Sequence, residues 1–298
     1  MLTPKSGHQA QQLVGMQRGT KRTRVIAVAS GKGGVGKTTL SINFSTALQM
    51  LNQRTVLFDA DFGLANVDVL LGLQPRRHLG HVLEGQARLT DILVETGTGL
   101  RIVPSASGQR WLAEMSDEMR TGLIHGFSEL AHDTDVLVID TAAGITSNVL
   151  ALAQAAQSVM VVVCDEPAAI TDAYALIKVL STDHRVRQFE VVANQTRSRG
   201  EGRNLFEKLQ RVTDRFLEVH LNYAGDVPYD DNIRLAIQQQ RTLVDWKPGS
   251  PAAQAIHELA RKALTWPQPD APRGHIEFFV ESLARPQAKG LMFAGALS

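Results

Sequence analysis

A glycine-rich loop between an apolar stretch and a helical pattern constrains this chain more than any other feature. Residues 25–39 read VIAVASGKGGVGKTT, and residues 31–38 match the pattern G-x-x-x-x-G-K-T. Glycine tolerates left-handed backbone conformations, so several N–H groups can converge on one anion, at which the following helix also directs its positive end. The stretch therefore predicts a strand, a phosphate-binding loop and a helix, in that order.

The residue types in this loop predict ATP and Mg²⁺ as ligands. Lys37 would place a positive charge on the β- and γ-phosphates, Thr38 would offer its hydroxyl to Mg²⁺, and Thr39 would bond the α-phosphate. The alternative is a glycine-rich turn that binds nothing. The predicted binding residues of the loop are Gly31, Lys32, Gly33, Gly34, Val35, Gly36, Lys37, Thr38 and Thr39.

A second lysine in the loop is unusual for a phosphate-binding loop. With Lys32 the loop reads K-G-G-V-G-K-T, which resembles the deviant Walker A motif of the MinD/ParA class of ATPases. In that class the early lysine reaches across a dimer interface to the phosphates of the partner subunit. The resemblance implies an ATP-dependent homodimer, whereas the alternative for Lys32 is a solvated loop lysine.

The composition is that of a cytoplasmic globular protein. Hydrophobic residues make up 44% of the 298 residues, enough for a sizeable core, and the net charge of +1 argues against strong direct binding to nucleic acid. A single cysteine, Cys164, cannot form an internal disulfide and suggests a reducing compartment. No apolar run has the length of a membrane span.

Apolar strands alternate with helical patterns, which predicts a doubly wound, mainly parallel sheet flanked by helices. Residues 66–95 read as three short helices inserted after the second strand. Strands are expected at 25–30, 55–58, 100–104, 135–140, 159–164 and 189–193 and from 224, and helices at 37–51, 109–132, 147–157, 202–218, 231–240 and 250–264 and after Pro167. The predicted units are a loose segment 1–23, an ATPase domain 24–265, and a linker with a helix at 266–298.

Acidic residues end two of the predicted strands, at the edge where ligands of parallel sheets bind. Asp61 is predicted to orient the attacking water, with Asp59 supporting it; the alternative is an aspartate that caps a helix beginning near Asn66. Asp140 ends the strand 135–140 and is predicted to hold Mg²⁺ through water. Gly144 could then contact the γ-phosphate through its backbone N–H.

Three residues are candidates for the adenine site. Asn194 follows the strand 189–193, and its amide offers both a donor and an acceptor to the base. Pro228 and Tyr229 lie in a turn and can pack on a base. The alternative for Asn194 is a turn residue without a ligand.

Beyond a proline-rich linker, residues 275–284 form an amphipathic pattern. Ile276, Phe279, Val280 and Leu283 are spaced to line one face of a helix. Such a helix can dock on protein or on a membrane surface, and the sequence leaves both open, since the apolar face is present but the basic face is not.

Several segments beyond the loop resemble the FleN/FlhG family, MinD-like ATPases that limit flagellar number in polarly flagellated bacteria. They are DADFGLANVDVLLGL, RIVPSASG, LVIDTAAGI, CDEPAAITDAYALIK, EGRNLFEKLQRVTDRFL and PRGHIEFFVE. The resemblance implies slow Mg²⁺-dependent ATP hydrolysis and partners similar to the transcriptional activator FleQ and the polar GTPase FlhF. It also implies a membrane-associated helix at 275–284, and hence a peripheral position at the inner face of the membrane at the cell pole.

The family pattern also assigns roles to single residues. It makes Lys32, acting in trans, Lys37 and Asp61 catalytic, Thr38 and Asp140 the Mg²⁺ ligands, and Asn194 with Pro228 the adenine site. One segment departs from the pattern. The FlhF-activating motif D-Q-A-x-x-L-R appears at residues 8–14 as HQAQQLV, without either charged end.

Other members of the same broad class are alternatives. A ParA-like DNA-partitioning ATPase would need a basic surface, which the near-neutral charge disfavours. A MinD-like division-site protein remains open and would be expected to have a more basic terminal helix. Nitrogenase-type reductases need cluster cysteines, and related tyrosine kinases need a terminal tyrosine cluster; this chain has neither.

Overall fold

The computed structural model describes residues 23–62, 66–105 and 126–267, which form one sheet covered by helices on both faces. The strands are β1 (Arg24–Ser30), β2 (Thr55–Ala60), β3 (Val94–Glu95), β4 (Arg101–Val103), β5 (Val136–Ala143), β6 (Ser158–Val163), β7 (Gln188–Thr196) and β8 (His220–Pro228). The helices are α2 (Lys37–Met50), α3 (Val67–Leu71), α4 (Leu79–Leu83), α6 (Ser147–Ala155), α7 (Pro167–Thr182), α8 (Glu201–Phe216), α9 (Asp231–Gln238), α10 (Leu243–Trp246) and α11 (Pro251–Ala263).

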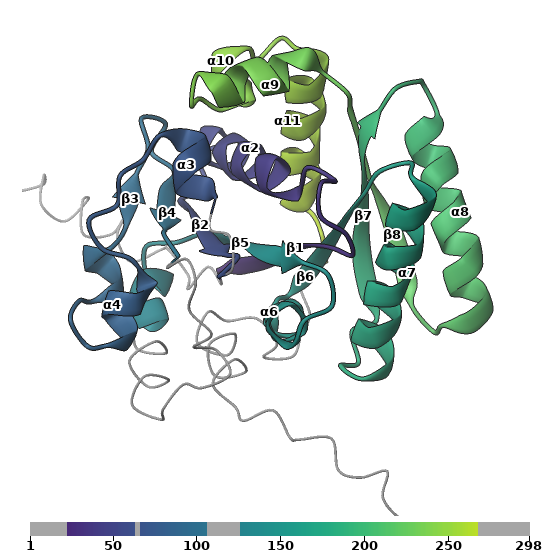
Figure 1. The fold of residues 1–298 in the computed structure, drawn as a ribbon, viewed down its shortest axis with the longest axis horizontal. Coiled ribbons are helices and arrows are strands. Elements are labelled where there is room, and N and C mark those ends of the chain that lie inside the picture. The colour runs from purple at the N-terminus through teal and green to yellow at the C-terminus, as the bar shows by residue number, and fades with distance from the viewer. Residues whose placement is uncertain (1–22, 63–65, 106–125, 268–298) are drawn as a thin grey trace, which may run out of the picture.

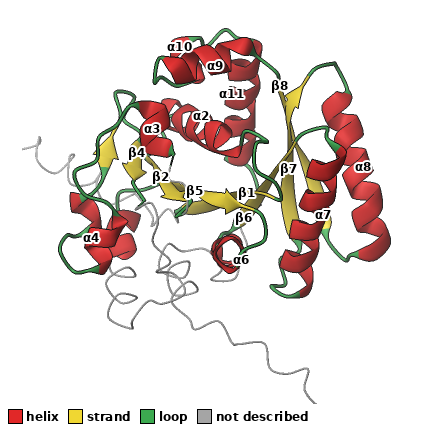
Figure 2. Cartoon of the chain, in the orientation of Figure 1, coloured by secondary structure: helices red, strands yellow, loops and turns green. Residues whose placement is uncertain are grey.

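The strand order is β3-β4-β2-β5-β1-β6-β7-β8, and every pairing is parallel apart from the one between β3 and β4. Helices α2, α10 and α11 lie over one face, while α6, α7 and α8 cover the other (Figure 1 and Figure 2). The prediction of a doubly wound, mainly parallel sheet is confirmed.

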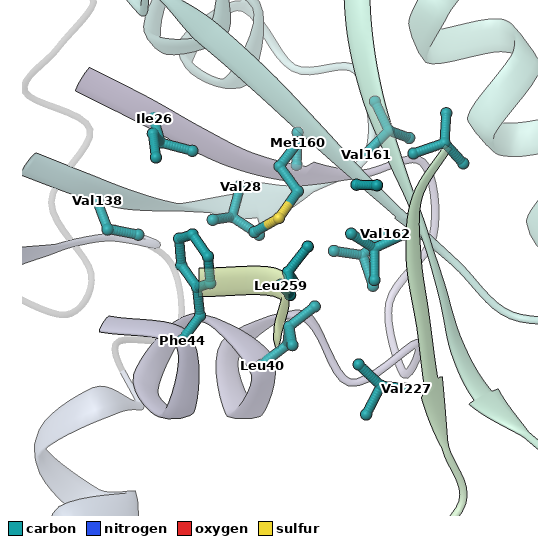
Figure 3. Packing of buried hydrophobic residues seen from close by; sticks show 14 of the residues in the cluster. Ile26, Val28, Leu40, Phe44, Val138, Met160, Val161, Val162, Val227 and Leu259 are labelled. Carbon is teal, nitrogen blue, oxygen red and sulfur yellow. The ribbon is translucent and has the colours of Figure 1, made fainter. Parts of the chain in front are cut away.

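The strands are apolar because both of their faces are covered. All residues of β1 are buried, and so are all residues of β6. Leu40 and Phe44 of α2 pack towards Val28 and Met160 of the sheet, beside Leu259 of α11 (Figure 3). This packing fixes the helix that follows the glycine loop against the strand that precedes it.

The insertion after the second strand differs from the prediction. The prediction of a third helix within residues 66–95 is wrong. Leu89–Asp91 form a single 3₁₀ turn, and β3, which follows it, pairs antiparallel with β4. Val94 lies opposite Ile102, and the Thr96 N–H donates to the Leu100 carbonyl at 2.9 Å. The pairing satisfies backbone groups at the edge of the sheet that a helix would leave open.

Three predicted segments fall outside the described residues. They are the loose segment up to residue 22, most of the helix expected at 109–132, and the amphipathic helix at 275–284. Residues 126–131, near the end of the second of these, are helical, and a turn at 132–133 follows them. The domain boundaries at 24 and 265 stay predictions.

Phe44 gives a direct test of the packing between α2 and the sheet. Its ring is fully buried, so we expect Phe44→Ala to lower the free energy of unfolding by about 3–5 kcal/mol, because the removed ring leaves a cavity. The measurement is urea denaturation of the nucleotide-free protein. Phe216→Ala is the matched control, since that ring is 62% exposed; its effect should stay within about 0.5 kcal/mol. Equal losses in both variants would contradict this account of the core.

Candidate nucleotide-binding site

The glycine loop lies between β1 and α2, and its conformation depends on particular glycines. Gly34 and Gly36 have φ of 85° and 83°, the left-handed region that side chains disfavour. Gly36 is the residue before α2, and the described residues offer that helix neither a side-chain cap nor an acidic residue in its first turn. The N–H groups and positive dipole of α2 are therefore available to an anion.

Gly31 has a different role, because it lies against α7. A Cβ atom at this position would overlap the backbone of Asp172 and Ala173. Around Gly33 and Gly34, in contrast, an added Cβ would meet no atom within 4 Å among the described residues. The loop is therefore anchored at its first glycine and open over the next two.

Lys37 and Asp140 form a buried ion pair at the centre of the site. Lys37 Nζ lies 2.8 Å from Asp140 Oδ1, with only 7% and 0% of the two side chains exposed. Ser41 Oγ donates to the same oxygen at 2.7 Å, while Asp140 Oδ2 is buried without a hydrogen-bond partner in the described part of the chain. A buried carboxylate oxygen without a partner is costly, and a cation or its water would satisfy it.

These features fit a nucleotide with a divalent cation. Thr38 Oγ1 lies 3.4 Å from Lys37 Nζ, so the two residues predicted to hold Mg²⁺, Thr38 and Asp140, are brought together around this lysine. No group of three or more His, Cys, Asp or Glu side chains in the described ranges could hold a metal by itself. A metal here would thus need oxygen ligands from a phosphate or from water, as Mg²⁺ commonly uses.

Asp59 organises the loop that follows β2. Its Oδ1 accepts from the N–H of Asp61 at 3.2 Å, and its Oδ2 accepts from Asn66 at 3.2 Å and Val67 at 3.3 Å. The alternative considered above was an aspartate that caps the helix beginning near Asn66. Asp59 is the residue that does so, because its carboxylate accepts from the N–H groups at the start of α3. Asp61 is half-buried at the carboxyl edge of the sheet, where the prediction places it.

The pKa of Asp59 is raised to about 7. Burial is the main cause, because 2% of the residue is exposed, and the negative charges of Asp140 and Asp61 add to it. Asp59 and Asp140 lie directly opposite each other in the pairing of β2 with β5. Two buried carboxylates therefore lie side by side at this edge, and the buried ammonium group of Lys37 forms an ion pair with one of them, Asp140.

A cavity of about 260 Å³ adjoins the loop on the side of α9 and α11. Asn194 and Tyr229 line it, whereas Pro228, the last residue of β8, is not among the described residues that do. Asn194 lies inside β7, so its alternative as a turn residue is wrong. Its Nδ2 donates to the Val35 carbonyl at 2.7 Å, which ties the cavity to the loop.

Sequence reasoning missed most of the cavity wall. The apolar lining residues Leu40, Val227, Ile233, Ile237 and Ile256 come from α2, β8, α9 and α11. In the sequence they look like ordinary core positions of amphipathic helices and a buried strand. The residues of this cavity that the sequence did indicate are Gly36, Thr39, Asn194 and Tyr229.

Lys32 lies in surroundings unlike those of Lys37. Its Nζ is 2.8 Å from Glu166 Oε2, and 39% of its side chain is exposed. The hydrogen bond and the charge of Glu166 raise the pKa of Lys32. Gly144, expected to contact a γ-phosphate, donates its N–H to the Ser30 carbonyl at 2.9 Å, because β5 stays paired with β1 as far as Ala143.

None of the described helices is both long and apolar enough to pass through a bilayer. That finding concerns residues 23–62, 66–105 and 126–267 and does not include the terminal amphipathic pattern.

Comparisons with known proteins agree with this geometry. A family model described as "ParA: NUBPL iron-transfer P-loop NTPase" matches residues 21–264. Antiactivator FleN of Pseudomonas aeruginosa is 53% identical over 90% of this chain and 95% of its own length. Flagellum site-determining protein YlxH of Helicobacter pylori is 32% identical over 80% of this chain and 81% of its own.

Among solved structures, the septum site-determining protein MinD of Pyrococcus horikoshii, complexed with Mg-ADP, is similar to this chain. Its TM-score is 0.67 at 27% identity, and the match covers 82% of this chain and 96% of the other.

The raised pKa of Asp59 predicts a pH dependence of stability. The native carboxyl holds its proton up to about pH 7, whereas the unfolded one, with the ordinary value of 3.8, releases it earlier. The native state therefore binds more protons between these values, so stability falls as the pH rises through them. Relative to Asp59→Asn, we expect the nucleotide-free wild type to lose up to about 4 kcal/mol between pH 4 and pH 7. Urea titrations at several pH values measure this, and a difference that does not change with pH would contradict it.

Proposed function

The chain belongs to the FleN/FlhG branch of the MinD/ParA P-loop ATPases, and from that premise we propose that ATP joins two copies of it face to face. In this proposal the dimer regulates flagellar number, and slow hydrolysis returns it to the monomer. ATPase activity follows from the family itself.

The contrast between the two lysines of the loop carries the proposal. Lys37 is buried, forms an ion pair with Asp140 and would act on the nucleotide of its own subunit. Lys32 is partly exposed at the edge of the site and forms an ion pair with Glu166. Exposed apolar side chains follow the strands at the same edge: Val69 is 63% exposed, Ile145 49% and Tyr229 54%. Single exposed apolar side chains are common on protein surfaces, so the contrast between the two lysines is the observation that supports the proposal.

The roles of the site residues follow from these contacts. Bound Mg²⁺–ATP would supply the reactive γ-phosphate and a cation to neutralise charge. Lys37 would turn from Asp140 to the phosphates, leaving Asp140 and Thr38 to hold the metal. Asn194 keeps Nδ2 on the loop, and its Oδ1 is an acceptor that matches the amino group of adenine and not the carbonyl of guanine.

The partners and location are part of the proposal. The names of two relatives, an antiactivator and a flagellum site-determining protein, support a FleQ-like transcriptional activator and an FlhF-like GTPase as partners. Residues 275–284 would place the cytoplasmic protein at the inner membrane face near the cell pole. The altered motif at residues 8–14 argues against activation of the GTPase through that segment.

Lys32→Ala tests the shared site. We expect this variant to bind ATP as a monomer and to lose ATP-dependent dimerisation, because the missing charge would act on the partner's phosphates. Light scattering after size exclusion, with and without Mg²⁺–ATP, gives the oligomeric state. Lys208→Ala is the matched control, since this lysine also forms a surface ion pair, with Asp165. If Lys32→Ala dimerised with ATP as strongly as the wild type, the proposed role of Lys32 at the partner's phosphates would be wrong.

Asp61→Ala tests the hydrolytic step. We expect ATP turnover to fall by about 100-fold or more, since a positioned base or water-orienting group contributes at least that much, while ATP binding persists. The ATP-bound dimer should then accumulate. Phosphate release measures turnover, and pull-down with this variant identifies the partner that the ATP form holds. Unchanged phosphate release would exclude Asp61 from the mechanism.

A further inference from the structure

The ion pair between Lys32 and Glu166 connects the loop to the start of α7. Lys32 Nζ and Glu166 Oε2 are 2.8 Å apart, with 39% and 60% of the side chains exposed. Exposed ion pairs are often incidental, because two long side chains seldom keep one geometry in water. Whether this pair matters therefore depends on how firmly its two ends are placed.

The backbone on the lysine side is fixed by two contacts. Gly31 lies so close to Asp172 that a Cβ atom would overlap the backbone of α7. The Lys32 carbonyl accepts from Ser30 Oγ at 3.0 Å. The Gly31 contact places the start of the loop against α7, and the hydrogen bond from Ser30 fixes the local turn at Lys32.

Glu166 is the residue that precedes α7, where Pro167 is the first helical residue. The residues that commonly cap a helix from this position are Ser, Thr, Asp and Asn, and Pro167 has no N–H to offer. Glu166 makes no such side-chain cap and bonds Lys32 instead, while its own N–H donates to the Cys164 carbonyl at 2.8 Å. Its carboxylate therefore contacts Lys32 and not the start of its own helix.

This pair opposes the step in which Lys32 acts. In the face-to-face dimer, Lys32 must approach the triphosphate of the partner, and Glu166 would bring a negative charge towards the same phosphates. Dimer formation would open two such pairs, one in each subunit.

We infer that Glu166 is a positioning residue for Lys32, which holds the lysine on its own subunit and sets the ATP concentration at which two subunits join. This inference rests on the proposed function, because it assigns a regulator to the same trans-acting lysine. Glu166 touches neither nucleotide nor metal in this account and acts through Lys32 alone.

The central experiment measures the ATP concentration for half-maximal dimerisation of the full-length protein. Glu166→Gln removes the charge with little change in shape and should lower that concentration by about two- to tenfold, the effect expected from two exposed ion pairs. The difference should shrink in high salt, which screens exposed charges. Glu166→Asp keeps the charge and should restore a midpoint closer to the wild type.

Two further variants separate the pair from a general change of charge. Asp165→Asn removes the neighbouring carboxylate, which pairs with Lys208 at 3.0 Å, and should leave the midpoint unchanged. In a Lys32→Ala background, Glu166→Gln should have no effect on oligomeric state. Acylation of Lys32, followed by mass spectrometry, should be faster in Glu166→Gln, because Glu166 raises the pKa of this amine.

The outcomes distinguish the inference from the proposed function. A wild type that stays monomeric with Mg²⁺–ATP would overturn the proposed function, and the role of Glu166 with it. If the wild type forms the dimer, an unchanged or higher midpoint in Glu166→Gln would overturn the positioning role alone. An equal shift in Asp165→Asn would overturn it too, because surface charge would then explain the effect.

Discussion

Strand β1 pairs in parallel with β5 on one side and with β6 on the other, and the candidate site depends on that arrangement. Parallel strands end at the same edge, so the loop after β1, the aspartates at the end of β2 and the end of β5 meet there. The register is specific: Asp140 lies opposite both Val28 and Asp59. A change of register by one residue would turn these carboxylates to the other face.

The edge formed in this way carries a charge imbalance in its buried part. Asp59 and Asp140 are both buried, and Lys37 forms an ion pair with Asp140. Asp59 instead accepts three backbone N–H groups, and its pKa rises to about 7. A divalent cation near Asp140 would reduce the repulsion between the carboxylates. The backbone hydrogen bonds that Asp59 accepts at this edge also fix the loop that carries Asp61.

Much of the fold and of the site could be predicted because the signals are local. The glycine loop, the buried strands and the acids at strand ends depend on neighbouring residues, and the sheet follows from their alternation. The missed features depend on distant contacts. Val227, Ile233 and Ile256 form one cavity wall although they come from different elements, and residues 94–95 became a strand only because β4 offered an open edge.

Local sequence did not indicate which group the side chain of Asn194 contacts in the folded chain. Asn194 is predicted to contact adenine or to lie in a turn, but β7 continues to Thr196 beside β8, and the Asn194 amide donates to the Val35 carbonyl. That contact places one residue on both the base cavity and the phosphate loop. The sequence could indicate a polar group there but could not indicate this connection.

The two lysines of the loop show how burial separates roles for identical side chains. Each is held by a carboxylate from a strand next to β1 or from the residues just after one: Lys37 by Asp140 within β5, and Lys32 by Glu166 just after β6. The first pair is shielded from water, so its electrostatic interactions are strong and its loss is costly. The second is exposed, so it can open at small cost when a stronger anion arrives. A loop with one cation fixed inside and one held loosely at the rim is therefore suited to bind its own phosphates tightly and to meet those of a second subunit reversibly.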